Sequence, residues 1–161
     1  MNTHTASFLR LLKNPLKSRL FLFARLPSAW FAGVRVRSVD ETTCKVTVPY
    51  KWFSKNPFRS TYFACLSMAA EMSTGALAMA HAYKRSPSVS MLVVKVESEY
   101  FKKATGRTEF TCSEGQLMYE AIEESTVSGE AKTVRARSTG KNKNGETIAE
   151  FIITWSFKAR K

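Results

Sequence analysis

The sequence NPFRSTYFACLSMAAEMSTGALAMAHAY, residues 56–83, is almost free of charge. Between Arg59 and Lys84, 24 residues contain one formal charge, Glu71, among alanine, methionine, leucine and small polar residues. Because good helix formers dominate, the composition predicts a helix over about 60–83. A helix that is apolar almost all round is normally buried, and a carboxylate inside it is costly unless it is paired, protonated or used. Glu71 is therefore the residue that needs an explanation.

The bulk composition fits one globular domain with a strong basic excess. The chain has 161 residues, 44% of them hydrophobic, and a formal net charge of +12. Such a charge favours anionic partners, namely nucleic acid, an acidic membrane surface or a phosphate-bearing small molecule, although a solvated basic surface fits equally well. The three cysteines show no metal-binding spacing, and their odd number argues against a complete disulfide framework. We therefore expect a cytoplasmic protein.

Several common kinds of chemistry are disfavoured by the motifs that are missing. The two histidines and seven glycines form no metal motif, dinucleotide fingerprint or phosphate-binding loop. Cys65 and His81 look like a nucleophile and its base, but on one helix they would be about 24 Å apart at 1.5 Å per residue. We expect neither a metal nor a redox cofactor.

Residues 1–39 contain seven lysines and arginines and no acidic residue. Their apolar residues recur at helical spacing, and Asn14 followed by Pro15 predicts a helix N-cap that separates two short helices, the second ending at Pro27. Three interpretations remain open for this segment: helices that pack on the domain, which we favour, a targeting peptide, or a membrane-surface helix. The segment does not contain a charged region, a long apolar region and a small-residue cleavage site in that order, so a secretory signal is disfavoured. The 60–83 helix is long enough to span a membrane, but Glu71 and its polar residues make a lipid-facing position costly.

The rest of the chain predicts strands around the central helix. Val34 and Val36 alternate with arginines, which starts a hairpin that turns at residues 40–42. Residues 89–102 are apolar on both faces, as in a central strand or one covered by a partner. Residues 116–127 predict a short acidic helix with Leu117, Ala121 and Ile122 facing inward. Further strands are predicted at 44–48, 107–112, 130–141 and 146–158, the last two joined by a turn at Asn144-Gly145.

This order of elements, strand–strand–helix followed by four strands that we expect to be joined by hairpins, predicts an α+β protein with an antiparallel sheet around one buried helix. The stretches NPFRSTYFACLSMAAEMSTG and VSMLVVKVESEYFKKATG are more specific. They resemble an uncharacterised branch of the hotdog-fold acyl-CoA thioesterase-like superfamily, in which an antiparallel sheet wraps a long central helix. The resemblance covers roughly residues 30–158 and implies a hotdog domain at 30–161. From its own pattern of residues we expect the amphipathic segment 1–29 to pack on that domain.

The resemblance also implies a catalytic site. Asn56 lies fifteen positions before Glu71, a spacing that matches an asparagine and an acidic residue of these thioesterases. Ser90 falls where a serine or threonine orients the attacking water. The family's His-Gly pair, which presents a backbone N–H group to the thioester oxygen, falls on Tyr62 and Phe63 and is not matched. The N–H of Phe63 or of Ala64, in the first turn of the helix, would have to replace it.

The neighbours of Glu71 on the predicted helix support a ligand site independently of the resemblance. One turn away on either side lie Ser67 and Gly75, so this face is small and partly polar. Glycine in mid-helix costs about 1 kcal/mol relative to alanine, which indicates a close approach at Gly75. Glu71 would then act as general base or nucleophile. The alternative is an ion pair between Glu71 and an arginine or lysine from a neighbouring strand or protomer, and Asn56 can equally serve the turn before Pro57.

The resemblance implies an acyl-CoA substrate and a homodimer or dimer of dimers, with no other cofactor than the coenzyme A part of the substrate. The phosphates would need basic residues, for which the candidates are Arg59, Lys84, Arg85, Arg135 and Arg137. The alternative function is a non-catalytic acyl-CoA or lipid-binding protein, held on an anionic membrane by residues 6–26. Aromatic residues near Lys51 and Lys55 suggest nucleic-acid binding as a third function. Because no recognition-module signature is present, we do not expect nucleic-acid binding.

Overall fold

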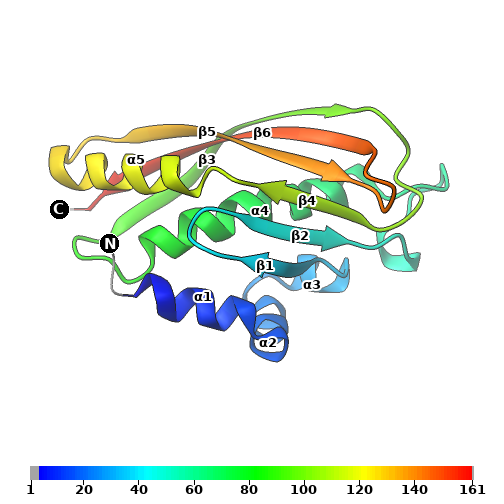
Figure 1. The fold of residues 1–161 in the computed structure, drawn as a ribbon, viewed down its shortest axis with the longest axis horizontal. Coiled ribbons are helices and arrows are strands. Elements are labelled where there is room, and N and C mark those ends of the chain that lie inside the picture. The colour runs from blue at the N-terminus through cyan, green and yellow to red at the C-terminus, as the bar shows by residue number, and fades with distance from the viewer. Residues whose placement is uncertain (1–3, 161) are drawn as a thin grey trace.

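The computed structural model describes residues 4–160 and contains five α-helices, one short 3₁₀ helix and six strands in that range (Figure 1). In chain order these are α1 (Thr5–Lys13), α2 (Pro15–Arg25), α3 (Pro27–Phe31), β1 (Arg35–Val39), β2 (Cys44–Val48), the 3₁₀ helix (Trp52–Ser54), α4 (Phe63–Ala82), β3 (Val89–Tyr100), β4 (Thr108–Cys112), α5 (Gly115–Ser128), β5 (Lys132–Lys141) and β6 (Thr147–Ala159).

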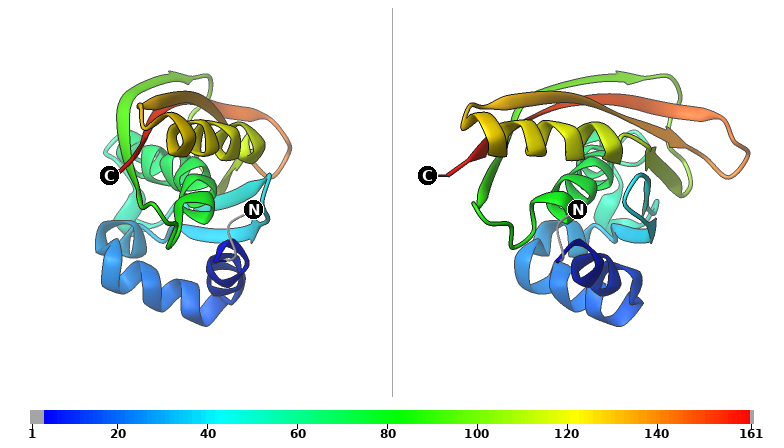
Figure 2. Two further views of the ribbon diagram at one scale, coloured as in Figure 1. Left: turned by 90° about the vertical axis from the view of Figure 1, so that its left-hand side faces the viewer. Right: turned by 60° about the vertical axis from the view of Figure 1, so that its left-hand side comes forward.

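The six strands form one antiparallel sheet that curves around α4, as predicted. The strand order is β1-β2-β4-β5-β6-β3. Figures 1 and 2 show α4 in the middle of the molecule, with the sheet arching over it and the N-terminal helices on the other side. Alternate side chains of β4, β5 and β6 point toward α4, so Phe110, Phe151 and Phe157 are fully buried with Leu77 of the helix. The predicted α+β architecture is confirmed.

The connection between β3 and β4 differs from our expectation. We expected a hairpin, but β3 pairs with β6 at one edge of the sheet, while β4 lies between β2 and β5. The connecting segment instead crosses the start of α4, where the backbone N–H and the hydroxyl of Thr61 both donate to the carbonyl of Ala104. We gave two explanations for the apolar residues of β3, a central position in the sheet or cover by a partner. The central position is wrong, so the explanation that remains is a strand covered by a partner.

The central helix begins three residues later than predicted. Thr61 forms a bridge with Lys55, and the N–H of Tyr62 donates to the carbonyl of Ser54, so residues 60–62 belong to the extended entrance of the helix. By length and composition α4 could cross a membrane, but most of that apolar window is buried inside the molecule. Its apolar character is explained by its place inside the sheet.

The N-terminal helices divide where the sequence predicts. The side-chain oxygen of Asn14 accepts hydrogen bonds from the N–H groups of Leu16 and Lys17 and caps α2. Pro27 does not only end α2 but also opens α3, because proline suits the first position of a helix. Helix α1 packs on β1 and α4, and its Phe8, Leu9 and Leu12 join the core.

Helix α5 has the predicted position but presents a different face to the core. Met118 and Ile122 are fully buried, whereas Leu117 is exposed, so the prediction for Leu117 is wrong. The start of the helix lies against the β1–β2 turn, since a Cβ atom on Gly115 would stand 2.1 Å from the carbonyl oxygen of Glu41. This contact fixes the rotation of the helix.

Candidate active site

Glu71 lies in the third turn of α4 and faces a largely apolar cavity of about 240 Å³, here called the Glu71 cavity. One wall is α4 itself. The opposite walls come from α1, α2, β1, β3 and β6, which contribute Phe8, Leu12, Phe21, Leu22, Val36, Met91 and Trp155 among others. The N-terminal helices thus help to enclose the one carboxylate of the central helix.

The carboxylate of Glu71 has no partner within residues 4–160. It is half-buried, and neither a hydrogen bond nor a nearby charge acts on it. Burial alone raises its pKa above the usual value for glutamate, because the charged form loses hydration. One form of the structural alternative, an ion pair with a basic residue of a neighbouring strand, is therefore not supported within residues 4–160.

The absence of a side chain at Gly75 leaves the space that the carboxylate of Glu71 occupies. A Cβ atom on Gly75 would lie 2.8 Å from Oε1 of Glu71 and 3.2 Å from Cζ2 of Trp155. The indole is held in turn, since its Nε1–H donates to the hydroxyl oxygen of Thr74 at 2.9 Å. The sequence predicted a close approach at Gly75, and the structure shows that the approaching groups are Glu71 and Trp155.

The raised pKa of Glu71 predicts a specific dependence of stability on pH. The folded protein holds this proton more tightly than the unfolded chain, so the contribution to stability is complete below about pH 4.3, the unfolded value, and is lost as the pH rises through the folded value. Glu71→Gln stays neutral, and we expect it to melt at a higher temperature than the wild type near pH 8, with the gap closing toward pH 4. Thermal unfolding followed by circular dichroism measures this. A gap of equal size at both pH values would contradict it.

Asn56 lies beside a different hollow, an open groove of about 770 Å³ at the N-terminal end of α4, here called the Asn56 groove. The side-chain oxygen of Asn56 accepts hydrogen bonds from the N–H groups of Phe58 and Ser60 and from the Ser60 hydroxyl. Asn56 therefore shapes its own turn, as the simpler interpretation predicted. Within residues 4–160 its side-chain NH₂ group has no hydrogen-bond acceptor.

The predicted oxyanion donors lie at the same end of the helix. The N–H of Tyr62 is already bonded to Ser54, whereas Phe63 and Ala64 occupy the first turn, where N–H groups have no acceptor inside the helix. The rings of Tyr62 and Phe63 stand edge to face at 4.9 Å, and both line the Asn56 groove. The pair that replaces His-Gly thus forms part of the groove wall.

Within one chain, α4 separates the Asn56 groove from the Glu71 cavity. Phe63 and Leu66 line the groove, whereas Glu71 and Gly75 line the cavity. Five residues separate Leu66 from Glu71, which corresponds to a rotation of about 140° around the helix. The structure therefore does not bring Asn56 and Glu71 into one hollow.

Two other predicted site residues also lie outside the Glu71 cavity. Ser90 of β3 lines a shallow hollow with Gly129 and Lys158, while its neighbour Met91 points into the cavity. Because successive side chains of a strand point to opposite faces, Ser90 cannot position a water molecule at Glu71 of its own chain. Ser67 lines neither the cavity nor the groove, although it lies one turn from Glu71 on α4.

The five basic residues proposed for phosphate binding are not brought together. Three of them form ion pairs with acidic residues: Arg85 with Glu123, Arg135 with Glu97, and Arg137 with Glu150. The other two lie at opposite ends of α4, Arg59 before its start and Lys84 after its end, which a helix of 20 residues places about 30 Å apart.

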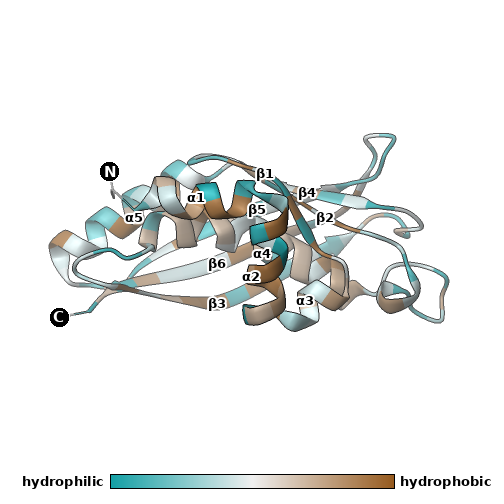
Figure 3. Ribbon diagram, turned by 90° about the horizontal axis from the view of Figure 1, so that it is seen from below, coloured by the Kyte–Doolittle hydropathy of each residue, from teal (hydrophilic) through white to brown (hydrophobic). Residues whose placement is uncertain are grey.

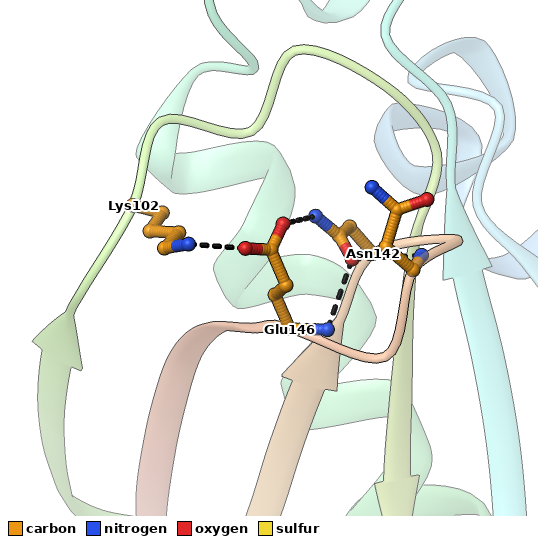
Figure 4. Close-up of polar contacts among 4 residues, drawn as sticks. Lys102, Asn142 and Glu146 are labelled. Carbon is orange, nitrogen blue, oxygen red and sulfur yellow. Dashed lines mark hydrogen bonds and ion pairs between the residues drawn. The ribbon is translucent and has the colours of Figure 1, made fainter.

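Sequence reasoning missed the lysines of the Asn56 groove, which are Lys55, Lys102 and Lys103. Lys102 is paired with Glu146, which also accepts a hydrogen bond from the side chain of Asn142, so the β5–β6 hairpin is tied to the segment after β3 (Figure 4). Lys55 and Lys103 form no ion pair within residues 4–160. Only the folded structure reveals that these two lysines lie close together, since they are 48 positions apart in the sequence.

A family model described as "Domain of unknown function (DUF4442)" matches residues 16–157. The chain belongs to the DUF4442 family. The match begins within α2 and ends within β6, so it covers Glu71 and the whole Asn56 groove of this DUF4442 protein, while the α1 wall of the Glu71 cavity lies before it. No curated protein matches the chain.

Solved structures establish the fold of this DUF4442 protein as the hotdog fold. PA5026 of Pseudomonas aeruginosa, described as a probable thioesterase, has a TM-score of 0.77 at 16% identity and covers 93% of this chain and 99% of its own. Thioesterase HI1161 of Haemophilus influenzae scores 0.65 at 9% identity, covering 92% and 95%. PaaI of Escherichia coli, from the phenylacetic acid degradation operon, scores 0.63 at 12%, covering 94% and 96%. These identities are low, so the likeness concerns the fold.

Proposed function

We propose that this protein hydrolyses acyl thioesters of the coenzyme A type. The observation that carries the proposal is the unpaired carboxylate of Glu71 at the wall of an apolar cavity closed by α1 and α2. Because burial raises the pKa of Glu71, its carboxylate is a stronger base than that of an ordinary glutamate, which suits a general base. The names of several structural neighbours, among them thioesterase HI1161, support this class of reaction.

In the proposed reaction the acyl chain occupies the Glu71 cavity and its carbonyl carbon faces the carboxylate. Glu71 removes a proton from water, and the water oxygen attacks the carbonyl carbon. The bond to sulfur then breaks, and the proton held by Glu71 passes to the sulfur, which releases the thiol and restores the carboxylate. Alternatively Glu71 attacks the carbon itself and the bond to sulfur breaks, so that the thiolate leaves and an anhydride forms, which water then cleaves to release the acid and restore Glu71. The N–H groups of Phe63 and Ala64 and the side-chain NH₂ of Asn56 would stabilise the oxyanion, and the free lysines of the Asn56 groove would face the phosphates.

A second copy of the chain would bring the two halves of such a site together. Strand β3 is a long edge strand with exposed apolar residues, Leu92, Val94 and Val96, and its unpaired edge is suited to strand addition. We propose a homodimer that pairs through β3, in which the Asn56 groove of one copy serves the Glu71 cavity of the other. This arrangement would overcome the separation imposed by α4 within one chain.

If the protein dimerises through β3, a single charge introduced on this strand should dissociate the dimer. We expect Val96→Lys to raise the dissociation constant of the dimer at least about 100-fold, because two like charges would be buried against each other. Sedimentation equilibrium measures the mass, and circular dichroism checks that the monomer stays folded. The matched control is Val127→Lys on α5, an exposed valine away from β3 that should leave the dimer intact. If Val96→Lys kept the dimer mass, β3 would not be the interface.

The size of the Glu71 cavity suggests the acyl group. A cavity of about 150 Å³ is known to bind benzene, so by proportion 240 Å³ accepts about ten carbon atoms. We expect thiol release to be fastest with medium-length or aromatic acyl groups in an assay that compares short, medium, long and aromatic acyl-CoAs. Absence of thiol release from all of them would refute the proposed hydrolysis.

One observation favours a second candidate function, the binding of acyl-CoA without hydrolysis. Of the three predicted catalytic residues, only Glu71 faces the cavity, while Asn56 is engaged by its own turn and Ser90 points elsewhere. Isothermal titration with a non-hydrolysable acyl-CoA thioether distinguishes the two. Tight binding without turnover of the matching thioester would identify a binding protein.

A further inference from the structure

Helix α2 carries two apolar faces, and only one of them is covered. Phe21 and Leu22 point inward to the Glu71 cavity. On the other side Leu16, Leu20 and Phe23, spaced by four and three residues, form a single face and are 70%, 60% and 53% exposed. Figure 3, seen from the side of α1 and α2, shows apolar residues along this helix.

Aromatic rings extend this exposed surface beyond α2. Phe23 contacts Trp30, which contacts Phe31, and Phe31 stacks on Phe53 at 5.5 Å between ring centroids. Trp52, which contacts Phe53, is 76% exposed at the end of the row. We call the exposed members of these two groups the α2 patch; they are Leu16, Leu20, Phe23, Phe31, Trp52 and Phe53.

Only positive charges lie on the segments that form the α2 patch. Lys17 and Arg25 lie on α2 itself, and Lys51 and Lys55 flank the aromatic end at Trp52. Within residues 4–160 the basic side chains of α2, which are Lys17, Arg19 and Arg25, form no ion pair with an acidic side chain. An exposed apolar face bordered by unneutralised basic residues is the arrangement of a helix that lies in the interface of an anionic membrane.

We propose that the α2 patch docks on an anionic phospholipid surface, with α2 lying in the membrane plane and Trp52 at the level of the headgroups. The charges favour lipid over a second copy of the chain, because a twofold contact through this patch would bring Lys17, Arg25 and Lys51 of two copies together. The inner face of α2 lines the Glu71 cavity, so docking would place that cavity one helix away from the bilayer. The proposal does not depend on thioester hydrolysis.

Co-sedimentation of the full chain with phospholipid vesicles tests the proposal. We expect binding to phosphatidylcholine vesicles that contain phosphatidylglycerol, weak binding to phosphatidylcholine alone, and a decline as salt is raised. The triple variant Leu16→Ser, Leu20→Ser, Phe23→Ser should lose binding, while Leu117→Ser with Val127→Ser, a pair of exposed apolar residues on α5, should keep it. Neutralising Lys17 and Arg25 with glutamine should weaken binding about fivefold for each charge.

Two further readouts make the outcome specific. The fluorescence of the wild type should shift to shorter wavelength on adding the anionic vesicles, and Trp52→Phe should remove that shift while the protein stays folded. Equal binding of the triple variant and the wild type would overturn the proposal, as would equal binding to neutral and anionic vesicles. The proposal would also be overturned if, in the absence of lipid, the wild type were a dimer and the triple variant a monomer, since the α2 patch would then join two copies.

Discussion

Replacing Glu71 with glutamine should lower kcat/KM for acyl-CoA hydrolysis by about 10²–10⁴, the range that a general base typically contributes. Glutamine keeps the size and shape of the side chain but can neither accept a proton nor form an anhydride. Because the carboxylate of Glu71 has no hydrogen bond or ion pair within residues 4–160 to lose, the variant should keep its fold and its affinity for a non-hydrolysable acyl-CoA. The effect should therefore fall on kcat.

The pH profile gives this prediction its internal control. Glu71 must be ionised to act, and burial raises its pKa, so the wild-type rate should climb with pH through a value above 4.3, the usual pKa of glutamate, and then level off. The residual activity of Glu71→Gln should lack this rise. Glu120→Gln, the same change on an exposed carboxylate of α5, should leave both rate and profile unchanged. An unchanged rate in Glu71→Gln would show that the carboxylate does not carry the reaction.

Features that depend on neighbouring residues were predictable from the sequence, while features that depend on long-range pairing were not. Asn14 caps the helix that follows it, and Asn144-Gly145 makes a tight turn with Gly145 at φ +81°, because each acts on its own backbone. The place of β3 at the edge depends on pairing with β6, whose residues come 49 to 70 positions later, so hairpin reasoning joined β3 to β4 wrongly. Leu117 was misplaced because the contact of Gly115 with a distant turn rotates α5.

The candidate site follows the same division. Glu71 and Gly75 were found because an acidic residue and a glycine both stand out in one buried helix. The residues near them in sequence did not show that Arg85 and Arg137 form ion pairs with Glu123 and Glu150. Nor did they show that Lys55 and Lys103 line the same groove. Nor does periodicity tell whether an apolar face of α2 is covered, because Phe21 and Leu20 are equally apolar and only one lines a cavity. Basic residues and amphipathic faces need the tertiary structure before a role can be assigned.

Replacing Gly75 with alanine should lower hydrolysis by up to about 10²-fold while leaving the protein at least as stable, since a displacement of about 1 Å at a reacting group costs that much in rate. The added methyl group would stand 2.8 Å from Oε1 of Glu71, and the carboxylate is the end of a flexible side chain that can move aside. Alanine also favours a helix over glycine by about 1 kcal/mol, which offsets the tighter contact with Trp155.

Opposite signs for activity and stability separate this positioning effect from a general loss of structure. Denaturant unfolding should give a free energy equal to the wild type or up to about 1 kcal/mol higher. Gly106→Ala adds the same methyl group where no atom lies within 4 Å and should leave the rate unchanged. The double variant Gly75→Ala, Trp155→Phe removes the indole that would contact the new methyl group. If its hydrolysis rate stays as low as that of Gly75→Ala, the displaced group is the carboxylate of Glu71 and not the indole. Full activity in Gly75→Ala would mean that the position of Glu71 does not limit the reaction.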